Sequence, residues 1–329
     1  MRMTMLANSG HEVSTLALGT MTWGRDTDEP EARSQYKAYV DAGGTFIDTA
    51  DSYAKGVSEE LVGQIVAEHG NRDSVFIATK AVKVDLPRMY NASPGHITSA
   101  LNSSLNRIGV DYIDLWQLHG WDPLTSIEET LAGVHNLYQQ GKFRYFGISN
   151  YSAWQTALVI SQCKYLGIPF ISTQHEYSLL ARGVEREILP LLVNQAKSFL
   201  AWSPLGRGVL TGKYRFGTPV DSRAASNHFA SFIQEHLTEE KSRIVDALVT
   251  AADGIGRSPT ETAIAWVRDR PGVSAVILGA RNLAQLRVLL GADNLVLPQE
   301  IIQALSDVSA PHSSYPESGW AQLSKERGN

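Results

Sequence analysis

The sequence is poor in cysteine, lacks a long apolar run and carries no concentrated block of charge. Cys163 is the sole cysteine among 329 residues, so no disulfide can form within the chain, and we expect a buried thiol in a reducing compartment. No run of about 18 apolar residues occurs, and the N-terminal stretch MRMTMLANSGHEV lacks the apolar segment of a secretory signal. We therefore expect neither a membrane span nor secretion, and a cytoplasmic location.

The charges are nearly balanced and evenly spread. Lysine and arginine number 29 and aspartate and glutamate 34, which leaves a net charge of −5. No basic cluster resembles the footprint that nucleic acid requires, so nucleic acid is not an expected partner. The remaining composition, 43% hydrophobic, 19% charged and 9% aromatic, is typical of a soluble globular enzyme with a large core.

Short apolar runs alternate with helical patterns along almost the whole chain, as in repeated β-α units around a parallel sheet. Strands are predicted at 15–20, 45–50, 75–80, 112–118, 143–149, 170–175, 198–203 and 275–279. Helices are predicted at 31–42, 58–69, 94–108, 126–140, 152–166, 184–195, 239–254, 259–270 and 283–290. Pro94 and Pro259 fit first helical turns, and Gly109, Gly141 and Gly167 fit the residue after a helix end.

Eight such units without a break in composition favour one closed barrel over a doubly wound sheet. No G-x-G-x-x-G follows the first strand, where a dinucleotide-binding Rossmann fold would carry it. We therefore predict an α/β protein, a single (β/α)8 TIM barrel domain over residues 1–329. Two additions are expected to be functional: a long loop after strand seven, from Gly206 to about His236, and a C-terminal tail from Ala310 that holds Tyr315 and Trp320.

Polar side chains stand at the C-terminal ends of four predicted strands, where barrel enzymes hold their chemistry. They are Asp48, Asp51 and Tyr53 after the second strand, Lys80 in the third, His119 after the fourth, and Gln174, His175 and Tyr177 at the sixth. Singly, each has an ordinary explanation, such as a turn aspartate, a solvated lysine or a packed histidine. Together they suit proton transfer, because a carboxylate can hold a lysine ammonium whose charge lowers the pKa of a neighbouring phenol. With no cysteine cluster, H-E-x-x-H or G-x-S-x-G, we expect neither a metal nor acyl transfer.

Eight ordered motifs resemble the successive signatures of the aldo-keto reductases. They are LALGTMTWG, FIDTADSYAKGVSEELVG, FIATK, IDLWQLH, GKFRYFGISN, STQHEYSLL, AWSPLGRGVLTGKY and ILGARNLAQL, and they span about residues 15–291. The branch that the chain most resembles includes the β subunits of voltage-gated potassium channels and many bacterial reductases. The resemblance implies a (β/α)8 barrel that binds an extended nicotinamide dinucleotide without a Rossmann motif.

The resemblance also implies a catalytic tetrad, on the same residues that the strand ends suggest: Asp48, Tyr53, Lys80 and His119. Tyr53 would protonate a carbonyl oxygen as hydride arrives, while Lys80 and its partner Asp48 ease the release of the proton. His119 would orient the carbonyl. The implied activity is the NADPH-dependent reduction of an aldehyde or ketone to an alcohol.

Cofactor contacts are implied along several strand ends. The nicotinamide would meet Ser149, Asn150, Gln174 and the ring of Trp202, near Gly19, Thr20, Met21 and Asp48. The pyrophosphate would meet Ser203, Pro204, Leu205, Gly206 and Gly208, with Lys213 and Arg223 as cationic contacts. After strand eight, Gly279, Ala280, Arg281 and Gln285 begin a helix, and a helix N-terminus with a guanidinium suits the 2′-phosphate of NADPH.

Three positions depart from the family pattern. Val288 and Leu289 stand where this branch commonly has an acid and an asparagine for the adenine amine, so the adenine contact is expected to differ. Ala54 replaces the glycine that usually follows the catalytic tyrosine, which constrains the loop that carries Tyr53.

The substrate pocket is expected to include Tyr53, His119 and two tryptophans, Trp23 and Trp121, whose aromatic walls favour an apolar or ring-bearing carbonyl compound. Two other functions stay open: a non-catalytic, cofactor-binding regulatory subunit of the channel-β kind, and a barrel lyase that uses Lys80 as a Schiff base. The complete tetrad favours the enzyme, and the short stretch before Leu16 does not match the channel-blocking extension of some β subunits. The physiological substrate, the direction of the reaction and the oligomeric state are left open, a homo-oligomer being one candidate.

Overall fold

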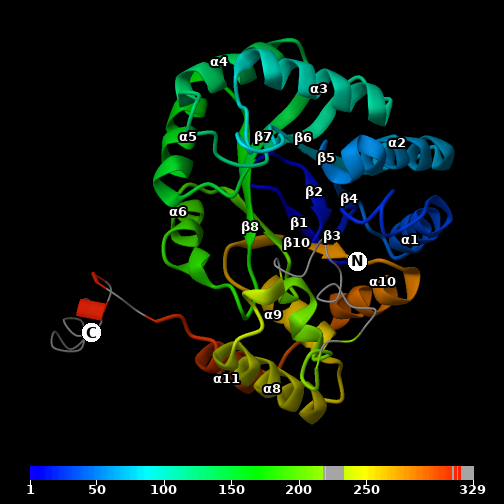
Figure 1. Cartoon of the computed structure of the whole chain (residues 1–329), viewed down its shortest axis with the longest axis vertical. Helices are drawn as coiled ribbons and strands as arrows, with labels where there is room; N and C mark the ends of the chain where they lie inside the picture. Colours follow the sequence, from blue (N-terminus) through cyan, green and yellow to red (C-terminus); the bar gives the residue numbers. More distant parts are fainter. Residues whose placement is uncertain (218, 220–232, 313–314, 317, 320–329) are drawn as a thin grey trace.

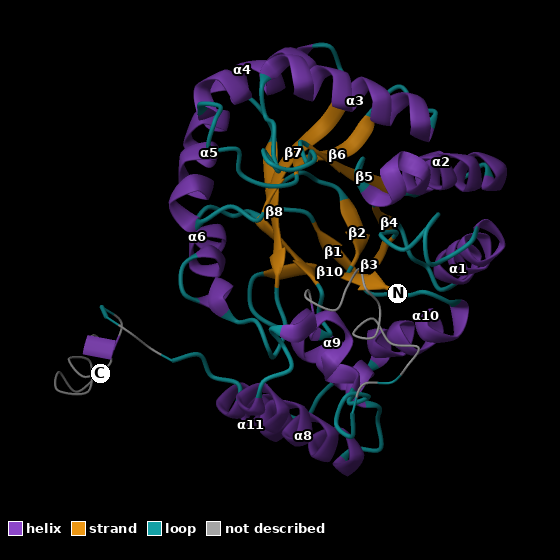
Figure 2. Ribbon diagram, in the orientation of Figure 1, coloured by secondary structure: helices purple, strands orange, loops and turns teal. Residues whose placement is uncertain are grey.

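The protein is a closed barrel of parallel strands inside a ring of helices (Figures 1 and 2). The computed structural model describes residues 1–217, 219, 233–312, 315–316 and 318–319. The barrel closes in the order β10-β3-β4-β5-β6-β7-β8-β9. Its strands are β3 Leu16–Gly19, β4 Phe46–Asp48, β5 Phe76–Ala81, β6 Ile113–Leu118, β7 Phe143–Ser149, β8 Phe170–Glu176, β9 Ser198–Trp202 and β10 Val273–Gly279. The predicted (β/α)8 TIM barrel is thereby confirmed.

Helices follow the strands and cover the outside of the barrel. They are α1 Glu29–Asp41, α2 Val57–His69, α3 Pro94–Ile108, α4 Ile127–Gln139, α5 Ala153–Leu166, α6 Ile188–Asn194, α8 Glu239–Gly254, α9 Pro259–Arg268, α10 Leu283–Leu290 and α11 Gln299–Val308. Side chains cap the first turns of α1, α4 and α9, since Asp28, Ser126 and Ser258 each accept a hydrogen bond from the backbone three residues on. Gly109 and Gly167 end α3 and α5 in the left-handed region, as their sequence positions predict.

Three elements differ from the prediction. Instead of one helix over 184–195, a 3-10 turn at Gly183–Glu185 precedes the short helix α6. The proline at position 190 explains this start, because its missing N–H is tolerated only in a first helical turn. Helix α11 was not expected, and neither was an N-terminal hairpin formed by β1 Met3–Met5 and β2 Glu12–Ser14.

The hairpin closes one end of the barrel. Leu6 and Val13 are completely buried and belong to one apolar cluster with Ala17, Phe46 and Phe76, which lie at the beginnings of the first three barrel strands. The N-terminal end of the barrel is therefore filled with apolar side chains. The opposite, C-terminal end is left for polar chemistry.

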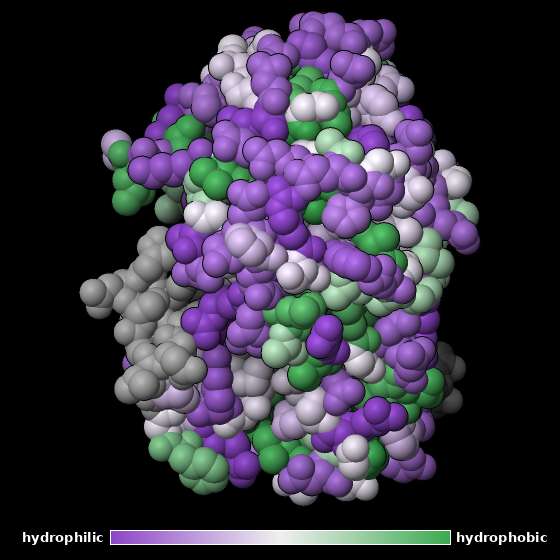
Figure 3. Space-filling model, turned by 90° about the vertical axis from the view of Figure 1, so that its right-hand side faces the viewer, coloured by the Kyte–Doolittle hydropathy of each residue, from purple (hydrophilic) through white to green (hydrophobic). Residues whose placement is uncertain are grey.

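One face of the molecule is mainly polar where the structure describes it. Figure 3 shows the side of the molecule that carries α1, α2 and α10, on which hydrophilic residues dominate and hydrophobic ones form small scattered groups. Among the described helices, none combines the length and the apolar character that spanning a membrane requires.

Candidate active site

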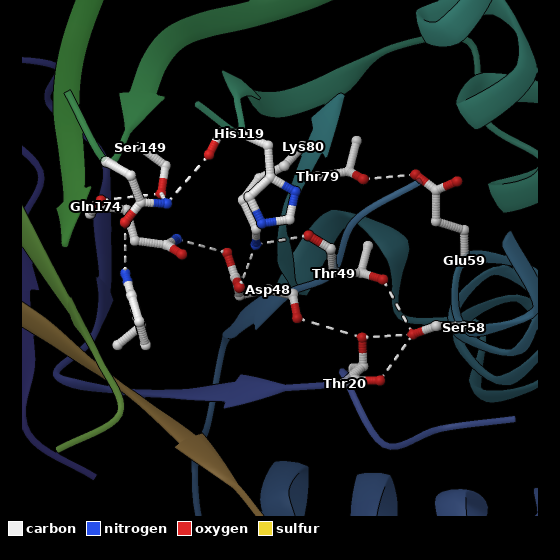
Figure 4. A network of polar contacts seen from close by, with 12 residues as sticks. Thr20, Asp48, Thr49, Ser58, Glu59, Thr79, Lys80, His119, Ser149 and Gln174 are labelled. Atoms are coloured by element: carbon white, nitrogen blue, oxygen red, sulfur yellow. Dashed lines mark hydrogen bonds and ion pairs between the residues drawn. The ribbon is translucent and has the colours of Figure 1, made fainter. Parts of the chain in front are cut away.

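A buried ion pair stands at the centre of the C-terminal end of the barrel (Figure 4). Lys80 on β5 and Asp48 at the end of β4 are 0% and 2% exposed, and the distance from Lys80 Nζ to Asp48 Oδ1 is 2.5 Å. Lys80 Nζ also donates to the carbonyl oxygen of Thr49 at 2.7 Å, and Gln174 Nε2 donates to Asp48 Oδ2 at 2.9 Å. Both carboxylate oxygens therefore have partners, which a charge removed from water needs.

The ion pair keeps Lys80 positively charged. Burial alone would lower the pKa of the ammonium group, but the charge of Asp48 and the contact with Tyr53 outweigh it, so the pKa of Lys80 is raised. A cation is thus fixed inside the barrel mouth over the working pH range.

Tyr53 and His119 lie against this cation. The ring centroid of Tyr53 is 5.2 Å from Lys80 Nζ and 5.9 Å from the ring centroid of His119, at an interplanar angle of 77°. Tyr53 begins a 3-10 turn, Tyr53–Gly56, and Ala54 within that turn has φ 47°. This is the left-handed region that glycine adopts without strain, so the alanine at position 54 does constrain the turn, as predicted.

Burial gives the tyrosine and the histidine opposite acid–base properties. The pKa of Tyr53 is raised, first by burial and then by Asp48, against the lowering effect of Lys80, so the phenol carries its proton at neutral pH. Burial, followed by the charges of Lys80 and Lys83, holds the pKa of His119 well below its usual value. The imidazole is therefore neutral and has one N–H to donate.

The amides expected to hold a nicotinamide lie beside the tetrad. Ser149 Oγ donates to the carbonyl oxygen of Gln174 at 2.9 Å, and Asn150 Nδ2 donates to the carbonyl oxygen of His119 at 3.1 Å. Asn150 is exposed, and its Oδ1 accepts from the indole Nε1 of half-buried Trp202 at 3.1 Å. A chain of hydrogen bonds thus joins the tetrad to Trp202 at the end of β9.

The residues after β9 form a tight turn with left-handed backbone. Ser203, Gly206 and Gly208 have φ values of 55°, 53° and 96°. Pro204 is buried, Leu205 is half-buried and Lys213 is exposed. Arg223 lies outside the described residues, as do the rest of 220–232 and residue 218 in the predicted loop 206–236, and Trp320 in the tail.

After β10, Gly279 is exposed and Ala280 is buried, and the chain then enters α10. The Asn282 side chain caps this helix by accepting from the backbone N–H of Gln285 at 2.9 Å, and Gln285 Oε1 accepts from the backbone N–H of Arg281 at 2.9 Å. Of the two residues expected to change the adenine contact, Val288 is 46% exposed, whereas Leu289 packs into the core.

The residues at the end of β3 support the site rather than face solvent. Gly19 and Thr20 are buried and Met21 is half-buried. The hydroxyl of Thr20 is bound by Ser58 Oγ at 2.8 Å, and the backbone N–H of Thr20 donates to the carbonyl oxygen of Asp48 at 3.0 Å.

The two tryptophans expected in the substrate pocket lie in different environments. Trp121 is half-buried and packs edge-on against Tyr151 and Trp154 at centroid distances of 5.3 and 5.7 Å. Trp23 is 0% exposed, and its indole N–H donates to Gln35 Oε1 on α1 at 3.1 Å. The expectation that Trp23 lines the pocket is therefore wrong for this structure, because the turn after β3 directs its ring into the core.

Sequence reasoning passed over two residues that the structure brings to this end of the barrel. Glu176 is the last residue of β8, and Arg207 stands between Gly206 and Gly208. Arg207 is 8% exposed and pairs with Glu176 through two hydrogen bonds of 2.9 and 2.6 Å. The sequence signal that could have identified Arg207 is its position between two glycines, Gly206 and Gly208.

Comparisons with known proteins agree with this geometry. The profile of the Aldo/keto reductase family matches residues 15–310. A probable voltage-gated potassium channel subunit beta of Arabidopsis thaliana is 35% identical over 322 residues, which cover 95% of this chain and 98% of that protein. Aldo-keto reductase YhdN of Bacillus subtilis is 34% identical over 88% of both chains. Aflatoxin B1 aldehyde reductase member 4 of Homo sapiens is 35% identical over 84% of this chain and 87% of that protein.

Proposed function

Because this chain belongs to the aldo/keto reductase family, we propose that it is an enzyme that reduces aldehydes or ketones to alcohols with NADPH. The observation that carries the proposal is the buried Lys80 ammonium, paired with Asp48 and lying 5.2 Å from the ring of Tyr53. A fixed cation beside a protonated phenol is the arrangement that proton donation to a carbonyl oxygen requires.

Tyr53 is the proposed general acid. Its raised pKa keeps the phenol protonated, and as its proton moves to the carbonyl oxygen, the Lys80 ammonium stabilises the phenolate that remains. Asp48 holds that ammonium in place. Neutral His119 offers its N–H to the same carbonyl oxygen and so orients the substrate.

The side chains around the tetrad fit a nicotinamide dinucleotide, which the family generally uses and which supplies the hydride when bound. Ser149, Asn150 and Gln174 present hydroxyl and amide groups that can both donate and accept, as a carboxamide needs. Trp202, hydrogen-bonded to Asn150, offers an aromatic face. The left-handed turn at 203–208, with its glycines, allows the backbone to approach a pyrophosphate closely.

Selectivity for NADPH is proposed to come from the start of α10 and from basic side chains. Arg281, at the N-terminal end of this helix, supplies a guanidinium for the 2′-phosphate, and Lys213 and Arg223 supply further positive charge. Half-buried Trp121, packed against aromatic neighbours, favours an apolar or ring-bearing carbonyl compound as substrate.

The test is the consumption of NADPH with a panel of aldehydes, ketones and quinones. Tyr53→Phe removes the proton donor and should lower kcat by on the order of 10²–10⁴ while NADPH still binds. Tyr165→Phe is the matched control, because Tyr165 lies on α5 with 86% of its surface exposed. Near-normal turnover by Tyr53→Phe would disprove the assigned role.

The similarity to a probable potassium channel subunit beta favours one alternative, a non-catalytic subunit that binds the cofactor for regulation. Tight NADPH binding without turnover of any carbonyl compound would support it. The lyase hypothesis is disfavoured, because a Schiff base requires a neutral amine and Lys80 is held as an ammonium by Asp48.

A further inference from the structure

A buried arginine joins the turn after β9 to the neighbouring strand β8. Arg207 Nε donates to Glu176 Oε1 at 2.9 Å and its terminal nitrogen donates to Glu176 Oε2 at 2.6 Å, which is the two-pronged geometry of a strong arginine–carboxylate pair. The same nitrogen lies 3.0 Å from Glu235 Oε1, so the guanidinium is held between two carboxylates.

The pair fixes an unusual backbone. Arg207 has φ 58°, in the left-handed region, and its backbone N–H donates to Ser203 Oγ at 2.8 Å. A non-glycine residue in this region carries strain that surrounding contacts must offset. The contacts of the Arg207 side chain with Glu176 and Glu235 are suited to that role, because they anchor the middle of the turn at 203–208.

His236 extends the anchor to the beginning of α8. Lys241 Nζ lies 2.9 Å from His236 Nδ1, and because an ammonium can only donate, Nδ1 is the acceptor. Nε2 then carries the proton and donates to Glu176 Oε1 at 3.1 Å. Glu176 is thus held from two sides, and these hydrogen bonds with Arg207 and His236 keep its pKa below the usual value despite burial.

A metal ion is the competing explanation for this cluster. One ligand atom each of Glu176, Glu235 and His236 lies within 4.8 Å of the others. The guanidinium of Arg207 already bonds to both carboxylates, and the Lys241 ammonium bonds to the imidazole, so a divalent cation would meet two positive charges. The geometry therefore fits an ion-pair anchor better than a metal centre.

The anchor adjoins Trp202. Glu176 and Trp202 are register partners in the β8–β9 pairing, and Arg207 Cζ lies 6.0 Å from the centroid of the Trp202 ring. Glu176 therefore contacts the strand that carries this indole through its backbone and the turn that follows it through its carboxylate.

From these contacts we infer that Arg207, held by Glu176, is a positioning residue for the dinucleotide: it shapes the turn at 203–208 and does not itself bind phosphate. This inference rests on the proposed function. The buried side chain of Arg207 binds protein carboxylates, whereas the side chain of Lys213 is exposed. The pyrophosphate is common to NADPH and NADH, so loosening the turn should weaken both nucleotides equally.

The test compares nucleotide affinities of Glu176→Gln and wild type. The substitution preserves size but removes the negative charge of the carboxylate that binds the buried guanidinium in two-pronged geometry, so NADPH and NADH should each bind roughly ten-fold more weakly, with an unchanged ratio. At saturating NADPH, kcat should stay within about three-fold of wild type, because the tetrad is intact. Arg215→Gln is the matched control, since it removes an exposed ion pair with Asp246 from the same stretch of chain.

The contrary outcomes are distinct. Unchanged affinity of folded Glu176→Gln, or a loss confined to NADPH, would overturn the positioning role, the latter by indicating contact with the 2′-phosphate. If Glu176→Gln does not fold, Arg207→Lys is the second test, because it keeps the charge but not the two-pronged geometry. Unchanged nucleotide affinity of Arg207→Lys would also overturn the positioning role. Failure of the wild type to bind either nucleotide would instead disprove the proposed function.

Discussion

Asp51 illustrates how the interior of this barrel changes the acidity of a single residue. It stands two positions before Tyr53, and its backbone N–H donates to the carbonyl oxygen of Lys80 at 2.9 Å. Burial, together with the nearby Glu59 carboxylate, raises the pKa of Asp51 from 3.8 to about 7, against the opposing effect of Arg107. The folded protein therefore binds this proton more tightly than the unfolded chain does, and the charged form destabilises the fold.

We predict that Asp51→Asn stabilises the protein more at pH 8 than at pH 5. A carboxyl whose pKa is raised on folding loses stabilisation as pH rises from its unfolded value through its folded value, here between about 4 and about 7. Urea denaturation of wild type and variant at both pH values measures the difference. Asp253→Asn, at an exposed position in α8, is the control, and an equal effect of Asp51→Asn at the two pH values would contradict the assignment.

Trp202 permits a second test with a single residue. Replacing the proposed nicotinamide contact by alanine removes an aromatic interaction of roughly 0.5–1.5 kcal/mol beyond area burial, so NADPH should bind several-fold to about ten-fold more weakly. Trp202→Phe keeps an aromatic face but loses the hydrogen bond to Asn150, so its affinity for NADPH should lie between those of wild type and Trp202→Ala. Thermal unfolding without ligand distinguishes a cofactor contact from a core residue. If Trp202 were a core residue, its replacement by alanine would cost about 3–5 kcal/mol of stability and leave the NADPH affinity unchanged.

At the scale of elements, the packing of α2 against α3 depends on a glycine at the contact between them. A Cβ at Gly63 on α2 would lie inside the contact distance of the Ile108 carbonyl oxygen, and backbone at that point cannot move aside as a flexible side chain can. This glycine is required by the approach of the two helices, not by a positive φ. The packing of helix against helix thus depends on a residue that intrinsic helix preference would disfavour.

We predict that Gly63→Ala lowers the free energy of unfolding by about 1–3 kcal/mol through overpacking. Gly95→Ala is the matched control on α3, because a Cβ at Gly95 has no neighbour within 4 Å among the described residues. Alanine is the better helix former by up to about 1 kcal/mol, so the control should be neutral or stabilising. Guanidinium denaturation of both variants tests the pair, and equal effects would show that Gly63 is not a packing constraint.

At the scale of the whole molecule, cofactor binding is expected to couple the strand ends of the barrel. The proposed contacts lie on β7, β8 and β9, on the turn after β9 and at the start of α10, which are held together only in the folded chain. A ligand that binds only the folded state raises the apparent stability in proportion to its occupancy.

NADPH at about 100 times its Kd should therefore stabilise the protein by about 2.7 kcal/mol. If the basic residues favour NADPH by about ten-fold, NADH at the same concentration should give about 1.4 kcal/mol, roughly half the rise in the thermal midpoint. Thermal unfolding with each nucleotide measures this, and NMN, which lacks the adenosine 2′-phosphate, is the control. Equal shifts with NADPH and NADH would refute the proposed selectivity.

The sequence by itself determined the order of strands and helices and the closed barrel. These features follow from local periodicity and from caps such as Ser258 and Gly109, which act within a few residues of one another. It also indicated that a carboxylate would hold Lys80, because the C-terminal ends of parallel strands meet at one end of a barrel, and the family resemblance implied Asp48 as this partner of Lys80. Their contact is confirmed at 2.5 Å, while their catalytic role stays a prediction.

Only the tertiary structure decided which side chains turn inward and which distant charges meet. Trp23 lies close to a strand end in sequence, yet the turn after β3 directs its indole to Gln35. The N-terminal hairpin packs against Phe46 and Phe76, which lie more than thirty residues away in the sequence. Its short strands therefore have little local sequence pattern that would predict them. Arg207 and Glu176 are 31 residues apart and meet because β8 and β9 pair in parallel. Such contacts depend on the path of the whole chain, which no local pattern encodes.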